Sequence, residues 1–304
     1  FGVKGATGVI AITTKKAKAG QTIINFNTSY GFKKLVNKIK MADASQFKTL
    51  FDEENANNGV ATPDYSALTA NTDWINAVTR TGQFTANNLS ISGSTDKNKF
   101  NLGLGYTYDE GIIRHEQLQK MLLSLGDEFK VNKAIKIGVN INASRQNLPY
   151  DATWVLDGAR KVMPQVSAQT KQFQVPNPYG LDTITRNLYP TVAPALQNSG
   201  VQNPLIQLEN EWNKTINIEY RTVGSVYAEI SFLRHFTFRS TFYADMSTVN
   251  KRQYVPLYDA YDPLHDSAYL ISTKTSVTEN DNNWRKFQQD HVLNYKANFG
   301  DHGL

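Results

Sequence analysis

The segment from Lys99 to Asp109 reads Lys-Phe-Asn-Leu-Gly-Leu-Gly-Tyr-Thr-Tyr-Asp, and it decides the fold class of this 304-residue chain. Every second residue is apolar or aromatic, and the residues between them are small or polar. This is the two-residue period of a β-strand whose two faces meet different surroundings. Its apolar face carries Phe100, Leu102, Leu104, Tyr106 and Tyr108.

The same alternation recurs in segments around 24–32, 120–126, 134–144, 236–246 and 290–299. Each is about ten residues long, the length that a tilted strand needs to cross a bilayer. Strands of soluble sheets usually have about five or six residues, so a soluble antiparallel sandwich is the less favoured alternative. The pattern predicts an all-β fold, a transmembrane antiparallel β-barrel. We expect Leu102, Leu104, Ile137, Val139, Phe238 and Phe242 to face lipid, and Asn101, Asn140, Arg239 and Asp245 to face inward.

Short and long connections between the predicted strands alternate along the chain. Short links are expected at 94–98, 131–134, 233–235 and 300–303, and long ones at 33–86, 109–117, 146–217 and 250–283. Membrane barrels show this parity because their periplasmic turns are short and their extracellular loops long. Helix signals after Asp43 and after Thr72-Asp73 predict short helices within the first long loop.

Composition excludes several classes of protein. The chain has no run of about 18 apolar residues, so membrane-spanning helices are not expected. It has no cysteine, which rules out disulfides, cysteine-ligated zinc and thiol catalysis. The net charge of +5 comes from dispersed lysines rather than from a basic patch interleaved with aromatics, so a nucleic-acid interface is not expected.

The sequence lacks the residue patterns of an enzyme or of a metal site. The five histidines are scattered without metal-ligand spacing, and no serine stands in a nucleophile elbow. The paired acids Asp109-Glu110 and Asp127-Glu128 would point to opposite faces of a strand. The acidic and amide-rich stretch 279–283 is interpreted as an unliganded polar loop rather than a calcium site, since it matches no EF-hand. We expect no catalytic residues and no cofactor.

The opening of the chain reads Phe-Gly-Val-Lys-Gly-Ala-Thr-Gly-Val-Ile-Ala-Ile-Thr-Thr-Lys-Lys over residues 1–16. Gly2, Gly5 and Gly8 permit close backbone approach or positive φ, and residues 9–13 have the composition of a buried strand. An ordinary turn and strand is the plain alternative. A phosphate-binding loop is disfavoured because the glycine spacing is wrong and no helix pattern follows.

This opening resembles the end of the plug domain in TonB-dependent outer-membrane receptors of the SusC/RagA type. That family typically reads aromatic-Gly-x-Arg-Gly-Ala-Asn-Gly-Val-Ile-x-Ile-Thr-Thr-Lys-Lys, so Lys4 replaces the usual Arg and Thr7 the usual Asn. Further matches cover essentially the whole chain: Thr72-Asp73-Trp74, the stretch 88–93, Gly105-Tyr106, Glu110-Gly111-Ile112, Asn203-Pro204-Leu205 and Thr237-Phe238-Arg239-Ser240.

The resemblance implies a bacterial outer-membrane protein that is not an enzyme. It implies TonB-dependent import of an oligosaccharide or a peptide, energised by the TonB-ExbB-ExbD complex, with a SusD-like surface lipoprotein as a lid. Residues 1–18 would end the plug, with Gly2, Lys4, Gly5 and Gly8 as its motif, and 19–304 would begin the barrel. Such barrels close with about 22 strands. Phe1 in place of Met and the abrupt end at Leu304 suggest a fragment, so we expect an open sheet of about eight strands.

The long loop near 146–217 is the predicted substrate site. It holds the aromatic residues Tyr150, Trp154, Tyr179, Tyr189 and Trp212 among the prolines Pro149, Pro164, Pro176, Pro178, Pro190, Pro194 and Pro204. Aromatic faces suit stacking on sugars or on peptide side chains, and long ordered loops are usually functional. The alternative is that these rings form the loop's own core or pack on the partner lipoprotein. Two other functions stay open: a passive porin without TonB coupling, and a surface β-protein.

Overall fold

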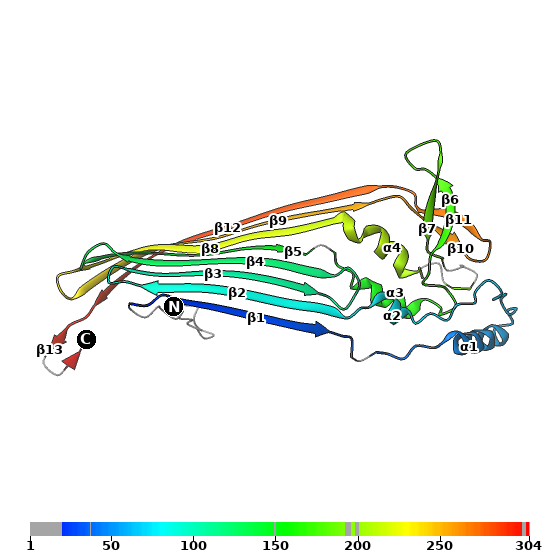
Figure 1. Ribbon diagram of the computed structural model, residues 1–304, viewed down its shortest axis with the longest axis horizontal. Helices are drawn as coiled ribbons and strands as arrows, with labels where there is room; N and C mark the ends of the chain where they lie inside the picture. The colour runs from blue at the N-terminus through cyan, green and yellow to red at the C-terminus, as the bar shows by residue number, and fades with distance from the viewer. Residues whose placement is uncertain are drawn as a thin grey trace.

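The computed structural model describes residues 20–36, 38–148, 150–191, 196–197, 201–299 and 302–303. Its main element is one open antiparallel sheet of eight strands in the order β1-β2-β3-β4-β5-β8-β9-β12 (Figure 1). The strands are β1 (Ile23–Lys33), β2 (Gly82–Ser94), β3 (Asn98–Glu110), β4 (Gln117–Lys130), β5 (Ile135–Asn147), β8 (Thr215–Phe232), β9 (Phe236–Val255) and β12 (Ser276–Tyr295). The predicted open sheet of about eight strands is confirmed.

All the larger connections gather at one end of the sheet, and the tight turns lie at the other (Figure 1). The first long connection holds α1 (Ala44–Asn57) and α2 (Trp74–Val78). The second holds α3 (Trp154–Lys161), the hairpin β6 (Lys171–Pro176) and β7 (Thr183–Leu188), α4 (Pro204–Glu211) and the 3-10 turn η2 (Trp212–Lys214). The third is the hairpin β10 (Tyr258–Asp262) and β11 (Ser267–Ser272). At the turn end, β13 (Asn298–Phe299) pairs with β14 (His302–Gly303).

The third long connection is shorter than the sequence predicts. Residues 250–255 and 276–283 were expected in a loop but belong to β9 and β12, where Asn250 pairs with Asp281 and Val255 with Ser276. Most side chains on both faces of these two segments are polar, so the sequence shows no alternation of apolar and polar residues. The strands still pair, because backbone hydrogen bonds do not depend on that alternation. Residues 279–283 therefore form a strand whose successive side chains point to opposite faces, not the polar loop that was predicted.

The register brings the predicted apolar residues onto one face of the sheet. Leu102 pairs with Leu125, which pairs with Ile141 on β5, and Val139 is aligned through Val226 with Phe242. Asn101, Asn140, Arg239 and Asp245 lie on the opposite face in the same registers. The predicted division of these ten residues between two faces is confirmed.

No described part of the chain forms a layer packed on the apolar face. Leu104 and Phe242 are each 47% exposed, and Phe26 and Leu293 are exposed as well. A continuous apolar surface of this extent requires an apolar environment such as lipid. No helix in the described part of the chain is long and apolar enough to cross a membrane.

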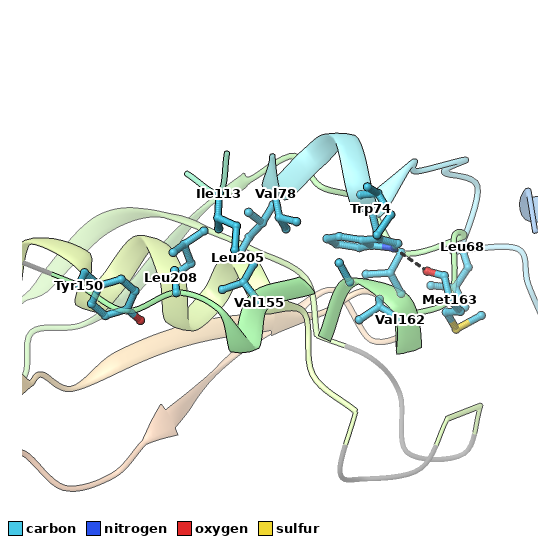
Figure 2. Packing of buried hydrophobic residues seen from close by; sticks show 14 of the residues in the cluster. Leu68, Trp74, Val78, Ile113, Tyr150, Val155, Val162, Met163, Leu205 and Leu208 are labelled. Carbon is cyan, nitrogen blue, oxygen red and sulfur yellow. Dashed lines mark hydrogen bonds between the residues drawn. The ribbon is translucent and has the colours of Figure 1, made fainter. Parts of the chain in front are cut away.

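The hydrophobic core lies among the connections rather than beneath the sheet (Figure 2). Trp74 and Val78 from α2 pack with Ile113 from the β3–β4 connection and with Val155 and Leu205 from α3 and α4. The Trp74 indole Nε1 donates a hydrogen bond of 3.0 Å to the Met163 carbonyl. We call this unit, built from connections 34–81, 111–116 and 148–214, the loop subdomain. Burial of each such side chain contributes roughly 1.5–3 kcal/mol towards ordering these connections.

Both helix signals in the first connection are confirmed. Asp43 caps α1 by accepting a hydrogen bond from Gln46 N at 2.8 Å, and Asp43 N donates one to Gln46 Oε1 at 3.1 Å. Asp73 caps α2 through Asn76 N. The predicted plug end at 1–18, with the motif Gly2, Lys4, Gly5 and Gly8, lies outside the described residues.

Candidate functional site

A cavity of about 700 Å³ opens where the polar face of the sheet meets the loop subdomain. The strands supply its lower wall with polar residues near their ends, Lys33, Asp109, Asn217 and Lys251, all on the polar face. The loop subdomain supplies the upper wall with Glu116, Tyr150, Asp151, Trp154, Gln207 and Glu211. The cavity has the volume and mixed lining of a site for a small or medium-sized ligand.

Tyr150 is fixed in the upper wall by the core. It is 9% exposed and packs in the same cluster as Val155 and Leu208 (Figure 2). Burial raises the pKa of its hydroxyl, and the Glu211 carboxylate adds to the shift. The nearby Trp154 side chain interacts with the Tyr150 hydroxyl and partly lowers its pKa again. The geometry of this interaction is not that of a normal hydrogen bond, and the hydroxyl forms no such bond with any other described residue.

Glu211 is a buried carboxylate at the end of α4. It is 2% exposed and accepts hydrogen bonds from Gln207 Nε2 at 3.2 Å and from Tyr258 Oη at 3.4 Å. Burial and this carboxylate raise the pKa of Tyr258 to about 12. The pair therefore keeps Tyr258 protonated as a donor, and the Glu211 carboxylate forms part of the cavity wall.

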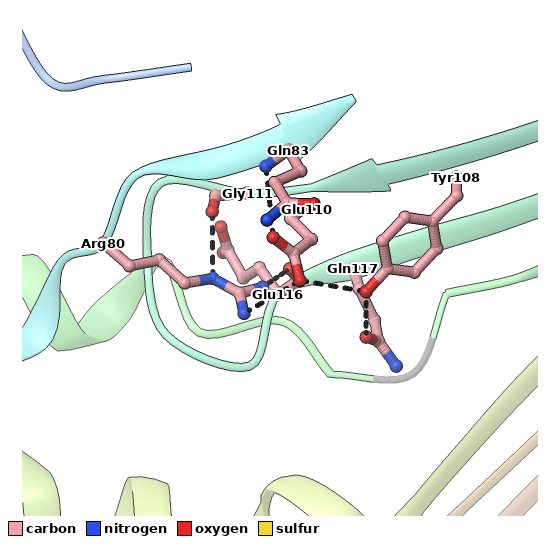
Figure 3. A network of polar contacts seen from close by, with 7 residues as sticks. All are labelled: Arg80, Gln83, Tyr108, Glu110, Gly111, Glu116 and Gln117. Atoms are coloured by element: carbon pink, nitrogen blue, oxygen red, sulfur yellow. Dashed lines mark hydrogen bonds and ion pairs between the residues drawn. The ribbon is translucent and has the colours of Figure 1, made fainter. Parts of the chain in front are cut away.

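The β3–β4 connection is held beside the cavity by Arg80 (Figure 3). Its guanidinium donates to the carbonyls of Gly111 at 3.3 Å and Glu116 at 2.7 Å and pairs with Glu110 at 3.4 Å. Tyr108 Oη donates to the same Glu110 carboxylate at 2.9 Å, and Gln83 N donates to it at 3.1 Å. This network fixes the backbone that carries Glu116 into the cavity lining.

The five aromatic residues predicted for substrate contact do not form one site. Tyr150 and Trp154 line the cavity together. Tyr179 and Tyr189 line a second cavity of about 400 Å³ between the β6–β7 hairpin and α4. Tyr179 is 73% exposed near the hairpin tip, whereas Tyr189 packs against the core. Trp212 lines neither cavity and packs against the core.

Most of the polar lining was not among the sequence-predicted residues. Four of these residues lie at inward-facing positions near the loop ends of their strands: Lys33, Asp109, Asn217 and Lys251. Extending the alternation of each strand to its loop end would therefore have identified them. Glu116, Gln207 and Glu211 have no such signal because tertiary packing alone brings them to the cavity. Among the described residues, no group of three or more His, Cys, Asp or Glu is arranged to hold a metal ion.

The curated proteins that this chain is similar to are TonB-dependent receptors. No protein-family model matches the sequence. The chain is 30% identical over 145 residues to TonB-dependent receptor P3 of Formosa agariphila, which covers 48% of this chain and 14% of the receptor. It is 24% identical over 293 residues to TonB-dependent receptor SusC of Bacteroides thetaiotaomicron, covering 86% of this chain and 28% of SusC.

The fold is similar to solved structures of the RagAB peptide transporter. One of them superposes with a TM-score of 0.73 at 16% identity, over 99% of this chain and 36% of the solved chain. Another, in the closed-closed state, gives a TM-score of 0.71. The chain thus spans about a third of the structures and a smaller share of the curated relatives that it matches.

Proposed function

Because this chain belongs to the SusC/RagA-type TonB-dependent receptors and spans part of one, we propose that the complete protein actively imports a nutrient across the outer membrane. TonB-dependent receptors are outer-membrane transporters and not enzymes. The exposed apolar face of the sheet agrees with that location, since it needs lipid against it. The open edges at β1 and β12 are where the remaining wall of the barrel would pair.

The cavity beneath the loop subdomain is the observation that carries the proposal. It lies at the loop end of the polar face, where a ligand entering from the loop side would first meet the barrel wall. Tyr150 and Trp154 offer flat apolar surfaces within a polar lining, a combination suited to sugar rings or to peptide side chains. We assign these two residues to substrate contact.

The cargo and the partners form the finer part of the proposal. An oligosaccharide or a peptide would be the cargo, and similarity to a protein described as a peptide transporter supports the second. A SusD-like lipoprotein would cover the loop end, and the TonB-ExbB-ExbD complex would supply energy. Tyr179 and Tyr189, in the second cavity at the rim, would meet either the cargo or this lipoprotein.

Uptake by the complete transporter tests the function. We expect cells to accumulate labelled oligopeptides or oligosaccharides only while the proton-motive force is intact, and to lose uptake when TonB is deleted. Uptake that continues after the force is collapsed would identify a passive porin instead.

Alanine variants test the assigned residues. Tyr150→Ala and Trp154→Ala should weaken ligand binding about twofold to tenfold without preventing barrel assembly, because stacking contacts of this kind contribute about 0.5–1.5 kcal/mol. Tyr269→Ala removes an aromatic ring from β11, outside the cavity, and serves as the matched control. Unchanged affinity in assembled Tyr150 and Trp154 variants would remove both residues from the site.

A further inference from the structure

The cavity lining carries an excess of negative charge. Four carboxylates, Asp109, Glu116, Asp151 and Glu211, face two lysines, Lys33 and Lys251, and no other charged side chain of the described residues lines the cavity. Lys33 pairs directly with Asp109. The two charges of this pair cancel, so within the lining the remaining three carboxylates are opposed by Lys251, while Arg80 acts on Glu116 from outside the lining. In a partly enclosed space such an imbalance favours a cationic ligand.

Glu116 and Asp151 form the accessible part of this negative region. Burial raises the pKa of Glu116, and the nearby charge of Asp151 raises it further. A backbone hydrogen bond from Ala152 and the positive charge of Arg80 oppose the shift. Asp151 stays ionised because Thr153 donates to it from Oγ1 at 2.7 Å and from the backbone N at 3.1 Å. Two neighbouring carboxylates that repel each other are both stabilised when a cation is placed between them.

Two unpartnered hydroxyl groups provide an independent indication of a missing ligand. Tyr150 Oη and Thr215 Oγ1 are buried, and neither forms a hydrogen bond of normal geometry with a described residue, although the Trp154 indole lies near Tyr150 Oη. Both residues line the same cavity. A buried polar group without a partner costs about 1–3 kcal/mol, so the position of both hydroxyls in the walls of one cavity indicates a polar molecule that completes the site.

We propose that the cavity binds a protonated primary amine of the imported ligand, which donates hydrogen bonds to the carboxylates of Glu116 and Asp151. This inference rests on the proposed transport function and specifies its substrate class. Trp154, at the start of α3, would pack against the uncharged part of the same molecule. Glu211 is too deeply buried to touch the ligand and acts through its charge.

A protonated amine can come from the amino end of a peptide or from a glucosamine unit. Two matched probe pairs separate these sources: tetra-alanine with a free amino end against N-acetyl tetra-alanine, and a glucosamine tetramer against its N-acetylated form. Acetylation removes the positive charge of the amine and adds a small neutral acetyl group. The complete purified transporter is incubated with each probe, and affinity is measured by calorimetry.

We expect at least one free-amine probe to bind about tenfold or more tightly than its acetylated partner, as charge-assisted hydrogen bonds imply. Glu116→Gln should abolish that preference while keeping the acceptor for Ala152 N. Asp157→Asn is the control, because it removes a carboxylate from the exposed side of α3, outside the cavity. Preference in the peptide pair alone or in the sugar pair alone would identify the source.

Three results would overturn the inference: equal affinities within both pairs, no binding of any of the four probes, or a loss in Glu116→Gln no larger than in Asp157→Asn. None of these three results bears on the transport function, which is tested separately by measuring uptake driven by the proton-motive force. Energised uptake of neutral oligomers without amine preference would leave the transporter assignment standing and reject the amine site. Absence of any energised uptake would reject the transport proposal itself.

Discussion

The imidazole ring of His115 lies parallel to the indole of Trp212, with ring centroids 4.3 Å apart and an interplanar angle of 7°. His115 adopts a positive φ of 68°, which is uncommon for a residue other than glycine. Its Nε2 contacts Glu209 Oε2 at 3.1 Å, and Arg114 contacts the other oxygen of that carboxylate at 3.5 Å. The strained tip of the β3–β4 connection is therefore fixed to α4 and η2 by stacking and by charge.

Trp212→Ala should release this connection. Loss of the stacked ring is expected to cost about 3 kcal/mol locally, because a partly buried indole is removed and the positive φ of His115 loses its support. Hydrogen-deuterium exchange of residues 111–116 in the complete transporter should become faster, while exchange in the strands stays unchanged. Tyr269→Ala should leave residues 111–116 as protected as in the wild type. Equal protection in both variants would show that the stack does not hold the connection.

Glu209→Gln should destabilise the loop subdomain in a pH-dependent manner. Burial alone would raise the pKa of Glu209, but His115 and Arg114 outweigh it and hold this pKa below its usual 4.5. A lowered folded-state pKa stabilises the protein above the unfolded value, and the contribution disappears as the pH falls through the folded value. The variant should therefore melt earlier at pH 7, and its difference from wild type should shrink below about pH 4.5. Glu53→Gln, on an exposed face of α1, is the control. A difference that grows on acidification would contradict this account.

Leu104→Arg should impair barrel assembly, whereas Asn140→Arg should be tolerated. The two residues lie on opposite faces of the sheet, and a basic residue on a lipid-facing position costs about 2–4 kcal/mol near the bilayer midplane. The measurement is the fraction of complete protein in membranes that shows the heat-dependent gel mobility of a folded barrel. A larger loss with Asn140→Arg would mean that the two faces have been assigned the wrong way round.

Gly138→Ala should strain the inner face of the sheet. A Cβ at Gly138 would lie 2.1 Å from a ring carbon of Tyr227, which is held by a 2.7 Å hydrogen bond to Glu128 and by the Arg239 guanidinium 3.6 Å from its ring centre. We expect a loss of about 1–3 kcal/mol in the thermal stability of the complete barrel.

The same substitution has a matched control and a rescue. Gly31→Ala places a Cβ where no atom lies within 4 Å, so it should change stability by less than about 0.5 kcal/mol. Combining Gly138→Ala with Tyr227→Ala should cost less than the sum of the two single changes, because the second removes the clashing ring. Additive losses would show that the ring is not the source of the strain.

The strands could be predicted from the sequence because each carries its own two-residue period, as between Lys99 and Asp109. Prediction fails where both faces of a strand carry polar residues. For this reason the sequence does not predict the end of β9, residues 250–255, or the start of β12, residues 276–283. The loop subdomain was beyond such reasoning, since Trp74, Ile113 and Leu205 come from three connections and no local pattern links them. Trp212 was assigned to substrate by residue type, whereas its position against His115 depends on tertiary contacts.

The hydrophobic core is built from the connections between strands, and this bears on the order in which the sheet and the loop subdomain form during folding. Trp74, Ile113, Val155 and Leu205 are far apart along the chain, and the strands between them fix where each connection starts and ends. Closing these long stretches before the strands are aligned would cost conformational entropy that no contact yet repays. We therefore expect the strands to pair first, hairpin by hairpin, and the cavity to be completed only after the sheet has formed. A site completed last would give the unassembled chain no affinity for a ligand.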